Sequence, residues 1–208
     1  MSEWVERVDE HDRVIGVMDR AEAVRGRFLH RIAAVVCRDP EGRVLMHRRG
    51  ADTERYPGCY DTVIGGGVDV GETYEAAAVR ELEEEMGVRL PAPPRRVFKK
   101  IYAEEHGGPY WMAVHDARLG PAEIASISPD PREIAWWGWM TEDEIRAGQD
   151  RLGLIGGDEN ALWTFLAHLA DEADLTDEPH LADEADLTDE PHLAEEADLA
   201  AGDAGRAG

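Results

Sequence analysis

The stretch that decides the fold of this chain runs from Gly66 to Val88 and reads GGVDVGETYEAAAVRELEEEMGV. Between Thr73 and Met86 it contains no proline or glycine and is rich in alanine, which favours a helix. Apolar side chains recur there at helical spacing, and the predicted apolar face consists of Val79, Leu82 and Met86. Thr73 is suited to cap the amino end, and Gly87 to end the helix in a left-handed conformation. The stretch therefore predicts an amphipathic helix.

Three glutamates gather near the carboxyl end of this predicted helix, namely Glu81, Glu84 and Glu85. Their spacing places them on one surface, where like charges repel and the helix dipole favours cations, each effect costing on the order of a few tenths of a kcal/mol. A hard divalent cation takes oxygen ligands, and Mg²⁺ is commonly shared between carboxylates and substrate phosphates. Arg80 is placed to orient a carboxylate by a charge-assisted hydrogen bond. The pattern predicts a cation and a phosphate-bearing ligand.

A solvated acidic helix face is the commoner origin of such a run of glutamates. That alternative explains neither the offsets of Gly66 and Glu72 from the helix nor the concentration of charge at its unfavourable end. Just before the helix, Gly65 to Gly67 predict a glycine-rich turn after a strand at residues 60–64. Glycine in a turn permits positive φ and lets the main chain approach a ligand closely.

The 208 residues carry a formal net charge of −23 that is unevenly distributed. From Leu169 onward fourteen acidic side chains stand against Arg206, which gives a net charge of −13 there and leaves −10 for residues 1–168. Non-specific nucleic-acid binding is not expected, because it depends on lysine and arginine to neutralise phosphates. No apolar run approaches the roughly 20 residues of a membrane span, and the acidic N-terminus does not resemble a signal peptide. We therefore expect a cytoplasmic protein.

Two cysteines, Cys37 and Cys59, are too few for a disulfide framework and are expected to serve as small apolar residues near the core. Alternating apolar patterns and turn signals predict a hairpin at residues 4–17, a second hairpin from residues 30–37 and 43–48, strands at 96–103, 110–116 and 133–140, and helices from Thr141 and from Glu159 to about Ala170. Residues 19–26 are expected to form a helical turn or a loop. Strands interspersed with helices indicate an α/β domain with a mixed sheet, assigned here to residues 1–168.

Beyond this domain, LADEADLTDEPH at residues 169–180 is repeated without change at 181–192, and a third, degrading copy begins at Leu193. The leucines recur every six residues, which forms no stripe on a helix, and Pro179 and Pro191 interrupt any helix. Residues 169–208 are therefore expected to be a disordered acidic tail into which the preceding helix frays. A partner-recruiting role for the tail and a sequence expansion without function both stay open.

Gly66, Glu72 and the run Arg80 to Val88 together resemble the Nudix box at nine fixed positions. The resemblance implies an α/β/α sandwich with a mixed sheet and a loop-helix-loop catalytic motif. It also implies a hydrolase that uses Mg²⁺, for which Mn²⁺ substitutes, to cleave a diphosphate linkage in a small-molecule substrate. By the same resemblance Glu81, Glu84, Glu85 and the Gly66 carbonyl would bind the metal, Arg80 would orient the carboxylates, and Glu72 would support the loop-helix geometry.

One carboxylate must accept a proton from the attacking water. Glu81 is the first candidate, and Glu104, Glu105 or Glu133 the second, although each of those three taken singly is more typical of a surface residue. Arg48 and Arg49, at the end of the strand at residues 43–48, are candidates for substrate phosphate binding; a simple surface pair is the equal alternative.

A wider resemblance, over about residues 4–90, is to the isopentenyl-diphosphate isomerase branch of the superfamily. It includes the N-terminal hairpin, His30, Arg48-Arg49 and the segment Tyr56 to Asp61. Those isomerases have a catalytic cysteine and a metal-binding histidine where this chain has Gly65 and Gly67, and they lack the intact box. Cys59 lies six positions too early to replace that cysteine. The departure favours a hydrolase over an isomerase.

Three functions remain in competition: the diphosphate hydrolase, the isomerase, and a non-catalytic module that senses a nucleotide or another diphosphate. For the hydrolase, the expected substrate is a nucleoside diphosphate derivative, with a prenyl or sugar diphosphate next. The aromatic residues that could stack on a nucleobase, or could simply pack in the sheet, are Tyr110, Trp111, Trp136, Trp137 and Trp139. The sequence leaves a homodimer open.

Overall fold

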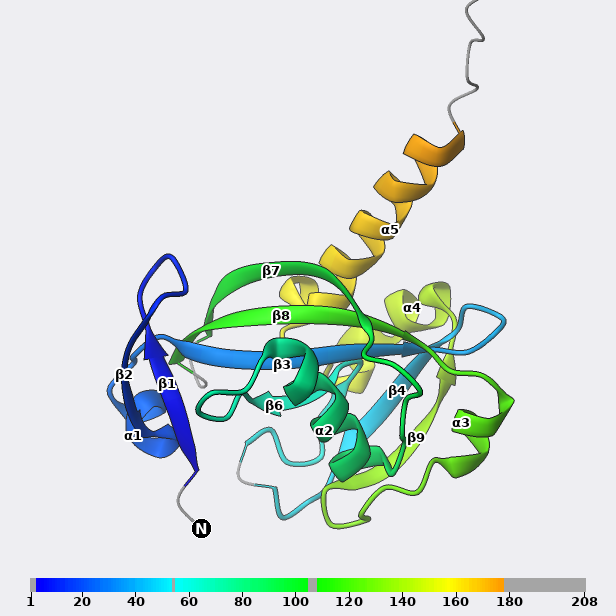
Figure 1. Ribbon diagram of the computed structural model, residues 1–208. Coiled ribbons are helices and arrows are strands. Elements are labelled where there is room, and N and C mark those ends of the chain that lie inside the picture. The colour runs from blue at the N-terminus through cyan, green and yellow to red at the C-terminus, as the bar shows by residue number, and fades with distance from the viewer. Residues whose placement is uncertain (1–2, 54, 105–107, 178–208) are drawn as a thin grey trace, which may run out of the picture. The chain divides into compact units, whose positions relative to one another are not determined.

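A computed structural model of the protein describes residues 3–53, 55–104 and 108–177 (Figure 1). The strands, in chain order, are β1 (Trp4–Val8), β2 (Val14–Asp19), β3 (His30–Arg38), β4 (Val44–Arg49), β5 (Tyr60–Asp61), β6 (Ile64–Gly67), β7 (Arg95–Glu104), β8 (Gly108–Arg118) and β9 (Ile134–Met140). The helices are α1 (Arg20–Arg25), α2 (Tyr74–Met86), α3 (Pro121–Ser126), α4 (Glu142–Leu152), a 3₁₀ turn η1 (Gly157–Glu159) and α5 (Ala161–Asp177). Within the described residues, no helix is long and apolar enough to cross a membrane.

The main sheet is mixed and is centred on β3. This strand pairs in parallel with β8 and antiparallel with β6, so that Ala33 lies between Ala113 and Gly66. β4 joins β3 at its far end, through Arg38 and Val44, and pairs antiparallel with β5 and β9. β7 completes the other edge beside β8. The predicted mixed sheet is confirmed.

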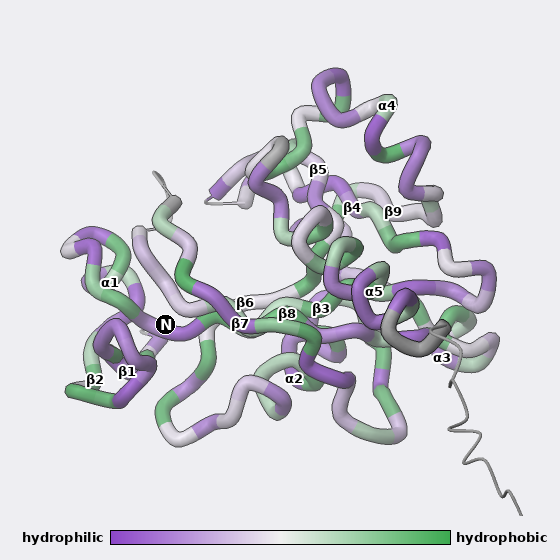
Figure 2. The backbone as a smooth tube through the Cα atoms, turned by 90° about the horizontal axis from the view of Figure 1, so that it is seen from above, coloured by the Kyte–Doolittle hydropathy of each residue, from purple (hydrophilic) through white to green (hydrophobic). Residues whose placement is uncertain are grey.

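Helices cover both faces of this sheet. On one face Leu82 and Met86 of α2 pack in a core with Leu45 of β4. On the other face Ile145 of α4 and Phe165 of α5 pack in a second core. Figure 1 shows the three layers, and Figure 2 shows hydrophobic residues along the central strands β3 and β8. Because side chains alternate between the faces of a strand, a strand with both faces covered has a continuous apolar run, as β3 has from Ile32 to Cys37. The predicted α/β/α sandwich is confirmed.

The predicted N-terminal hairpin forms a separate two-stranded sheet from β1 and β2 beside the start of β3. Asp12 in its turn fixes it to the domain, because the Asp12 carboxylate accepts hydrogen bonds from Arg31 Nε at 2.6 Å and from the Tyr74 hydroxyl at 3.2 Å. Lys99 also donates to Asp12. The side chain of Asp12 is 7% exposed, so this ion pair is far less screened than a surface pair. The hairpin therefore has a fixed position against the domain.

Helix α2 has the predicted caps. The Thr73 hydroxyl accepts a hydrogen bond from the Ala76 amide at 3.1 Å, and Gly87 ends the helix at φ 70°. The predicted apolar face needs one correction, because Val79 is only half-buried while Ala78 is fully buried. Tyr74, Ala78 and Leu82, each four positions apart, form the buried stripe.

The predicted glycine turn is wrong, because Gly65, Gly66 and Gly67 belong to strand β6 and none has a positive φ. The predicted strand at residues 60–64 is divided between β5 and β6. What requires glycine here is close packing, since a Cβ on Gly65 would lie 2.0 Å from the Ala33 carbonyl oxygen.

Two features at the surface differ in extent from the prediction. Helix α3, at Pro121–Ser126, was not predicted. Helix α5 extends to Asp177, so it includes the first residues of the acidic repeat, and the compact unit runs to Thr176. The second and third copies lie outside the described residues, and the boundary at residue 168 and the disorder of the tail stay predictions.

Candidate active site

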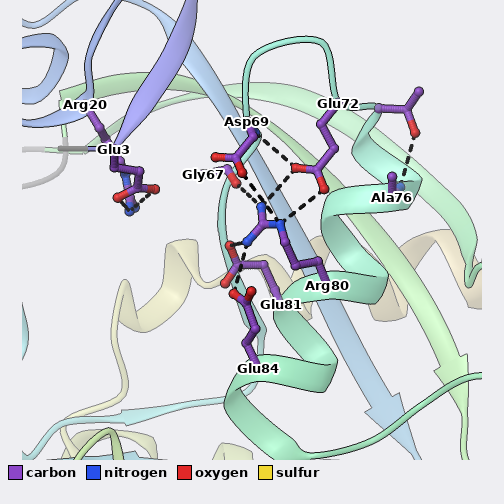
Figure 3. Close-up of polar contacts among 10 residues, drawn as sticks. Glu3, Arg20, Gly67, Asp69, Glu72, Ala76, Arg80, Glu81 and Glu84 are labelled. Atoms are coloured by element: carbon purple, nitrogen blue, oxygen red, sulfur yellow. Dashed lines mark hydrogen bonds and ion pairs between the residues drawn. The ribbon is translucent and has the colours of Figure 1, made fainter. Parts of the chain in front are cut away.

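Arg80 connects the loop before α2 with the acidic face of that helix (Figure 3). Its Nε and Nη2 groups donate to the Glu72 carboxylate at 3.1 and 2.9 Å, and Nη2 also donates to the Gly67 carbonyl oxygen at 2.8 Å. Its Nη1 group donates to Glu81 at 2.8 Å and to Glu84 at 3.2 Å. Hydrogen bonding to Glu72, and then to Glu81, raises the pKa of Arg80 above its usual value. One guanidinium thus holds three carboxylates and one carbonyl group.

Glu72 holds the loop itself. Its Oε2 atom also accepts the Asp69 amide at 3.1 Å, and the Glu72 amide donates to the Asp69 carbonyl at 3.0 Å. This turn brings the chain from β6 into α2, and Arg80 closes it from the helix side. The loop-helix unit is therefore held by side chains and does not depend on the caps alone.

Glu81 points back toward β6 and is only 8% exposed. A Cβ on Gly66 would lie 2.4 Å from Glu81 Oε1, so the Gly66 backbone is in direct contact with this carboxylate. Burial raises the pKa of Glu81, although Arg80 and Arg20 oppose that effect. The contact makes glycine necessary at position 66 for a reason that involves the acidic cluster itself.

Glu85 lies one turn further along α2 and faces a cavity. Burial, together with the charge of Glu81, raises the pKa of Glu85 to about 8, while Arg49 opposes the shift. Glu133 and Asp61 add further negative charge in the surroundings. Burial and neighbouring negative charges disfavour the ionised form of this carboxyl group, and a nearby cation would stabilise that form. Carboxyl groups with strongly shifted pKa values concentrate at functional sites.

Glu84 differs from the other two because it is exposed and ion-paired with Arg80. Among the described residues, no three histidine, cysteine, aspartate or glutamate side chains are grouped closely enough to hold a metal ion. The donor types nevertheless fit a hard cation, because Glu81 and Glu85 both offer carboxylate oxygens. The pKa values of both carboxyl groups are raised, and Glu81 lies so close to Gly66 that a side chain at position 66 would collide with it. The ligand set inferred from the sequence stays a prediction.

The cavity beside Glu85 has a mixed lining. Its charged and polar lining includes Arg20, Arg49, Arg55, Asp61 and Glu85, together with Gly66. Its apolar and aromatic lining includes Ile32, Val63, Tyr102, Tyr110, Met112 and Ile155. A second cavity shares Arg49 and Glu85 and is otherwise mainly polar, with Asp52, Thr53, Arg132 and Glu133. The first cavity therefore combines groups for an anion with a surface for an organic moiety.

The structure separates some residues that the sequence grouped. Arg49 lines both cavities and donates from Nε to the Arg55 carbonyl at 2.9 Å, whereas Arg48 is exposed and lines neither. Glu133 lines the second cavity with Glu85. Glu105 and the side chain of Glu104 lie outside the described residues. Of the five aromatic residues considered for base stacking, Tyr110 alone is in the lining of the first cavity.

Four charged residues of the first cavity, Arg20, Arg55, Asp61 and Glu159, were missed by sequence reasoning. Asp61 accepts the Thr62 amide at 2.7 Å and the Asn160 side-chain amide at 3.3 Å, and burial raises its pKa to about 6. The only signal for Asp61 was its place in the segment Tyr56 to Asp61 that resembles the isomerase branch. Arg20 gave no such signal, because it reaches the cavity from the start of helix α1, far from the acidic helix in the sequence.

The sheet, the two helical layers and the loop-helix unit define an α/β/α protein with an acidic helix at a cavity lined by both basic and acidic side chains. Comparison with protein families identifies the class of protein more narrowly, because the model of the NUDIX domain matches residues 28–156. The chain belongs to the Nudix family and is a Nudix hydrolase.

Curated relatives agree with this assignment. The chain is 41% identical over 151 residues to an uncharacterised Nudix hydrolase of Streptomyces coelicolor, covering 73% of this chain and 80% of that protein. It is 35% identical over 145 residues to an isopentenyl-diphosphate Delta-isomerase of Nocardia farcinica, covering 69% of this chain and 82% of that protein. It is 30% identical over 141 residues to a prenyl-diphosphate phosphatase of Methanosarcina mazei, covering 68% and 81%. The predicted membership of the superfamily, with similarity to the isomerase branch, is confirmed.

Proposed function

We propose that this chain is a Mg²⁺-dependent hydrolase that cleaves the diphosphate linkage of an organic diphosphate. The observation that carries the proposal is the placement of Glu85 and Gly66, with Glu81 packed against Gly66, at a cavity lined by three arginines. Arginine side chains are suited to bind phosphate oxygens, and carboxylates are suited to bind a divalent cation. The family generally uses divalent metal ions, and Mn²⁺ is expected to substitute for Mg²⁺.

The residues that would hold the cation are Glu81, Glu84, Glu85 and the Gly66 carbonyl. A cation held there would neutralise charge on the substrate phosphates and would lower the pKa of a water bound to it. Arg80 keeps the Glu81 and Glu84 carboxylates directed to one side of the helix through hydrogen bonds at 2.8 and 3.2 Å. Their arrangement therefore depends on Arg80 before any ligand arrives.

The chain's own groups account for substrate binding and proton transfer. Arg49 lies where it can hold phosphate oxygens, and its hydrogen bond to the backbone carbonyl of Arg55 holds the Arg49 side chain at the cavity. The attacking water gives its proton to a carboxylate, for which Glu81 is the first candidate because it is buried against Gly66 and burial raises its pKa. Glu133, in the second cavity with Glu85, is the second candidate.

The organic part of the substrate is expected to be a hydrocarbon chain. Ile32, Val63 and Met112 offer the cavity an aliphatic surface. Of the aromatic residues considered for base stacking, the one in the lining, Tyr110, is 5% exposed and already stacks on Tyr102 with ring centroids 6.0 Å apart. The relative named as a prenyl-diphosphate phosphatase supports the same choice. A prenyl diphosphate therefore replaces the nucleoside derivative as the first substrate to test.

The isomerase is the second candidate function, because one relative carries that name. Neither cysteine lines the cavity, and burial raises the pKa of the Cys37 thiol to about 12, which leaves it unreactive. The positions of the isomerase cysteine and histidine are Gly65 and Gly67 in strand β6. These observations favour hydrolysis over isomerisation.

The test measures phosphate and pyrophosphate release from prenyl diphosphates, nucleoside di- and triphosphates, dinucleotides and nucleotide sugars, with Mg²⁺ or with a chelator. Glu84→Gln is compared with Glu83→Gln, a matched control on the same helix whose carboxylate pairs with Arg89. We expect metal-dependent release that falls roughly a hundredfold or more in Glu84→Gln and stays near wild type in Glu83→Gln. Metal-dependent binding without turnover on any substrate would favour the non-catalytic sensor.

The expected partner is the small-molecule diphosphate substrate, and the expected location is the cytoplasm. Non-specific nucleic-acid binding is not expected. A homodimer stays a prediction left open by the sequence.

A further inference from the structure

Arg20 reaches the cavity from outside the region that defines the family. The family match begins at residue 28, whereas Arg20 opens helix α1 directly after strand β2 of the hairpin. Its side chain lines the cavity together with Gly66 and Glu85, and it is 19% exposed. A cationic side chain from the start of helix α1, directly after the N-terminal hairpin, therefore belongs to the same cavity as the acidic helix.

Glu3 holds Arg20 at two points, as Figure 3 shows for the side chains. The Arg20 amide donates to the Glu3 carbonyl oxygen at 2.8 Å. The Arg20 Nη1 group donates to both Glu3 carboxylate oxygens at 2.9 Å. Backbone and side chain are thus fixed by the same residue, which lies across the hairpin where Trp4 and Asp19 are paired.

The ion pair lies against strand β6. A Cβ on Gly67 would lie 2.7 Å from Glu3 Oε1 and 3.5 Å from Arg20 Nε. The carbonyl oxygen of Gly67 is the one that accepts from Arg80 Nη2. Arg20 and Arg80 therefore both contact strand β6, which carries Gly66. The positive charge of Arg20 also opposes the rise in the pKa of Glu81.

Glu3 leaves most of the Arg20 guanidinium available. Within the described part of the chain, Nε and Nη2 of Arg20 have no hydrogen-bond or ion-pair partner. These two nitrogens form the edge of the guanidinium that suits a phosphate group, to which it can donate two parallel hydrogen bonds. Because Glu3 engages Nη1 only, it orients the fork without occupying it.

We propose that Arg20 binds the phosphate groups of the substrate and that Glu3 is the positioning residue that presents its guanidinium to them. The N-terminal segment, which the family match does not include, thereby completes the diphosphate-binding end of the cavity. This inference rests on the proposed function, because it assumes that the substrate carries a diphosphate. Asp12 supports the arrangement by anchoring the hairpin to Arg31 and Tyr74.

The experiment compares Glu3→Gln, Arg20→Gln, Arg20→Lys and the double variant Glu3→Gln/Arg20→Gln in the full chain. Glu10→Gln is the matched control, because Glu10 is an exposed acid in the turn of the same hairpin. KM and kcat are measured separately with the best diphosphate substrate, and the Kd of inorganic pyrophosphate is measured by calorimetry. Thermal melting verifies that every variant folds.

We expect Arg20→Gln to raise KM and the pyrophosphate Kd roughly tenfold or more while kcat changes by less than about threefold. Arg20→Lys should recover part of the loss, since it keeps the charge without the fork. Glu3→Gln should raise KM about three- to tenfold, and the double variant should match Arg20→Gln, because Glu3 acts only through Arg20. Glu10→Gln should behave as wild type.

The inference is overturned if Glu3→Gln behaves as Glu10→Gln, or if it lowers KM, which would make Glu3 a competitor of the substrate. Equal effects of Glu3→Gln in the presence and absence of Arg20 would also contradict it. Wild-type turnover that Arg20→Gln leaves unchanged overturns the inference but keeps the hydrolase. Wild-type protein that neither hydrolyses diphosphates nor binds pyrophosphate contradicts the proposed function, and the inference with it.

Discussion

Arg80 donates two hydrogen bonds to Glu72, from Nε to Oε1 at 3.1 Å and from Nη2 to Oε2 at 2.9 Å. The remaining donors of the same guanidinium reach Gly67, Glu81 and Glu84. A single side chain therefore sets the geometry of the loop and of two of the three glutamates. The Arg80 side chain is 26% exposed, so this network is partly shielded from solvent.

The first prediction concerns Arg80→Lys. Lysine keeps the charge but cannot reach Glu72 and Glu81 with a rigid fork, so the acidic face should lose its arrangement. We expect kcat to fall roughly ten- to a hundredfold and the free energy of unfolding to fall by about 1–2 kcal/mol. Steady-state kinetics and urea denaturation measure the two effects. Arg89→Lys, at a surface pair with Glu83, is the control, and equal results for both variants would refute the role given to Arg80.

The second prediction concerns Gly66→Ala. The added Cβ would meet Glu81 Oε1 at 2.4 Å, so the carboxylate must move away from β6. We expect activity to fall by roughly tenfold or more while circular dichroism retains the native spectrum. Gly16→Ala is the control, because a Cβ there meets nothing within 4 Å. Full activity in Gly66→Ala would show that the position of Glu81 is not critical.

The third prediction concerns pH and His47. This side chain is 1% exposed, its Nδ1 atom has no partner among the described residues, and burial lowers its pKa from 6.5 to about 3. The folded state keeps His47 neutral, whereas the unfolded chain takes up a proton below about pH 6.5. Stability is therefore fully present above pH 6.5 and is lost as the pH falls toward 3, by about 2 kcal/mol at pH 5.

Urea denaturation from pH 7 to 5 tests this linkage. His47→Gln should flatten the decline of the unfolding free energy with falling pH, whereas His11→Gln, at an exposed position in the hairpin, should leave the slope as in wild type. His30 and His115 are also buried with lowered pKa values and should add slope of the same sign. An unchanged slope in His47→Gln would show that His47 titrates normally in the folded protein.

The fourth prediction concerns the organic moiety. Val63→Thr keeps the shape of a residue in the cavity lining but adds a hydroxyl group that a hydrocarbon substrate leaves unpaired. We expect kcat/KM for prenyl diphosphates to fall about tenfold, with a smaller change for nucleoside diphosphates. Val97→Thr, in the same core but outside the cavity lining, should have no such selectivity. A uniform loss on both substrate classes would argue against a hydrocarbon-binding wall.

Local signals made part of this structure predictable. Thr73 and Gly87 set the ends of α2 because capping depends on residues within one turn of the helix. Helix α4 likewise begins after Thr141 as predicted, where Thr141 and Glu144 form a capping box with the Thr141 amide donating to Glu144 at 2.8 Å. The mixed sheet followed from strands and turns that each have a local pattern.

Tertiary contacts explain what was missed. The glycine content of residues 65–67 suggested a turn. These residues form strand β6 instead, because they pair with β3, and the local sequence does not encode that pairing. Arg48 and Arg49 are equivalent in sequence, but the sheet brings only Arg49 to the cavities. Arg20 belongs to the cavity because a salt bridge with Glu3 and the anchoring of Asp12 place the hairpin there.

The central claim is tested most directly by turnover of a prenyl diphosphate with Mg²⁺ in water enriched in ¹⁸O. Attack of water on phosphorus predicts metal-dependent release of phosphate or pyrophosphate, with one ¹⁸O atom incorporated at the phosphorus that is attacked. Conversion of isopentenyl diphosphate to its allylic isomer without phosphate release would contradict the hydrolase and support the isomerase. Release that persists when Mg²⁺ is chelated would contradict the role assigned to Glu81, Glu84 and Glu85.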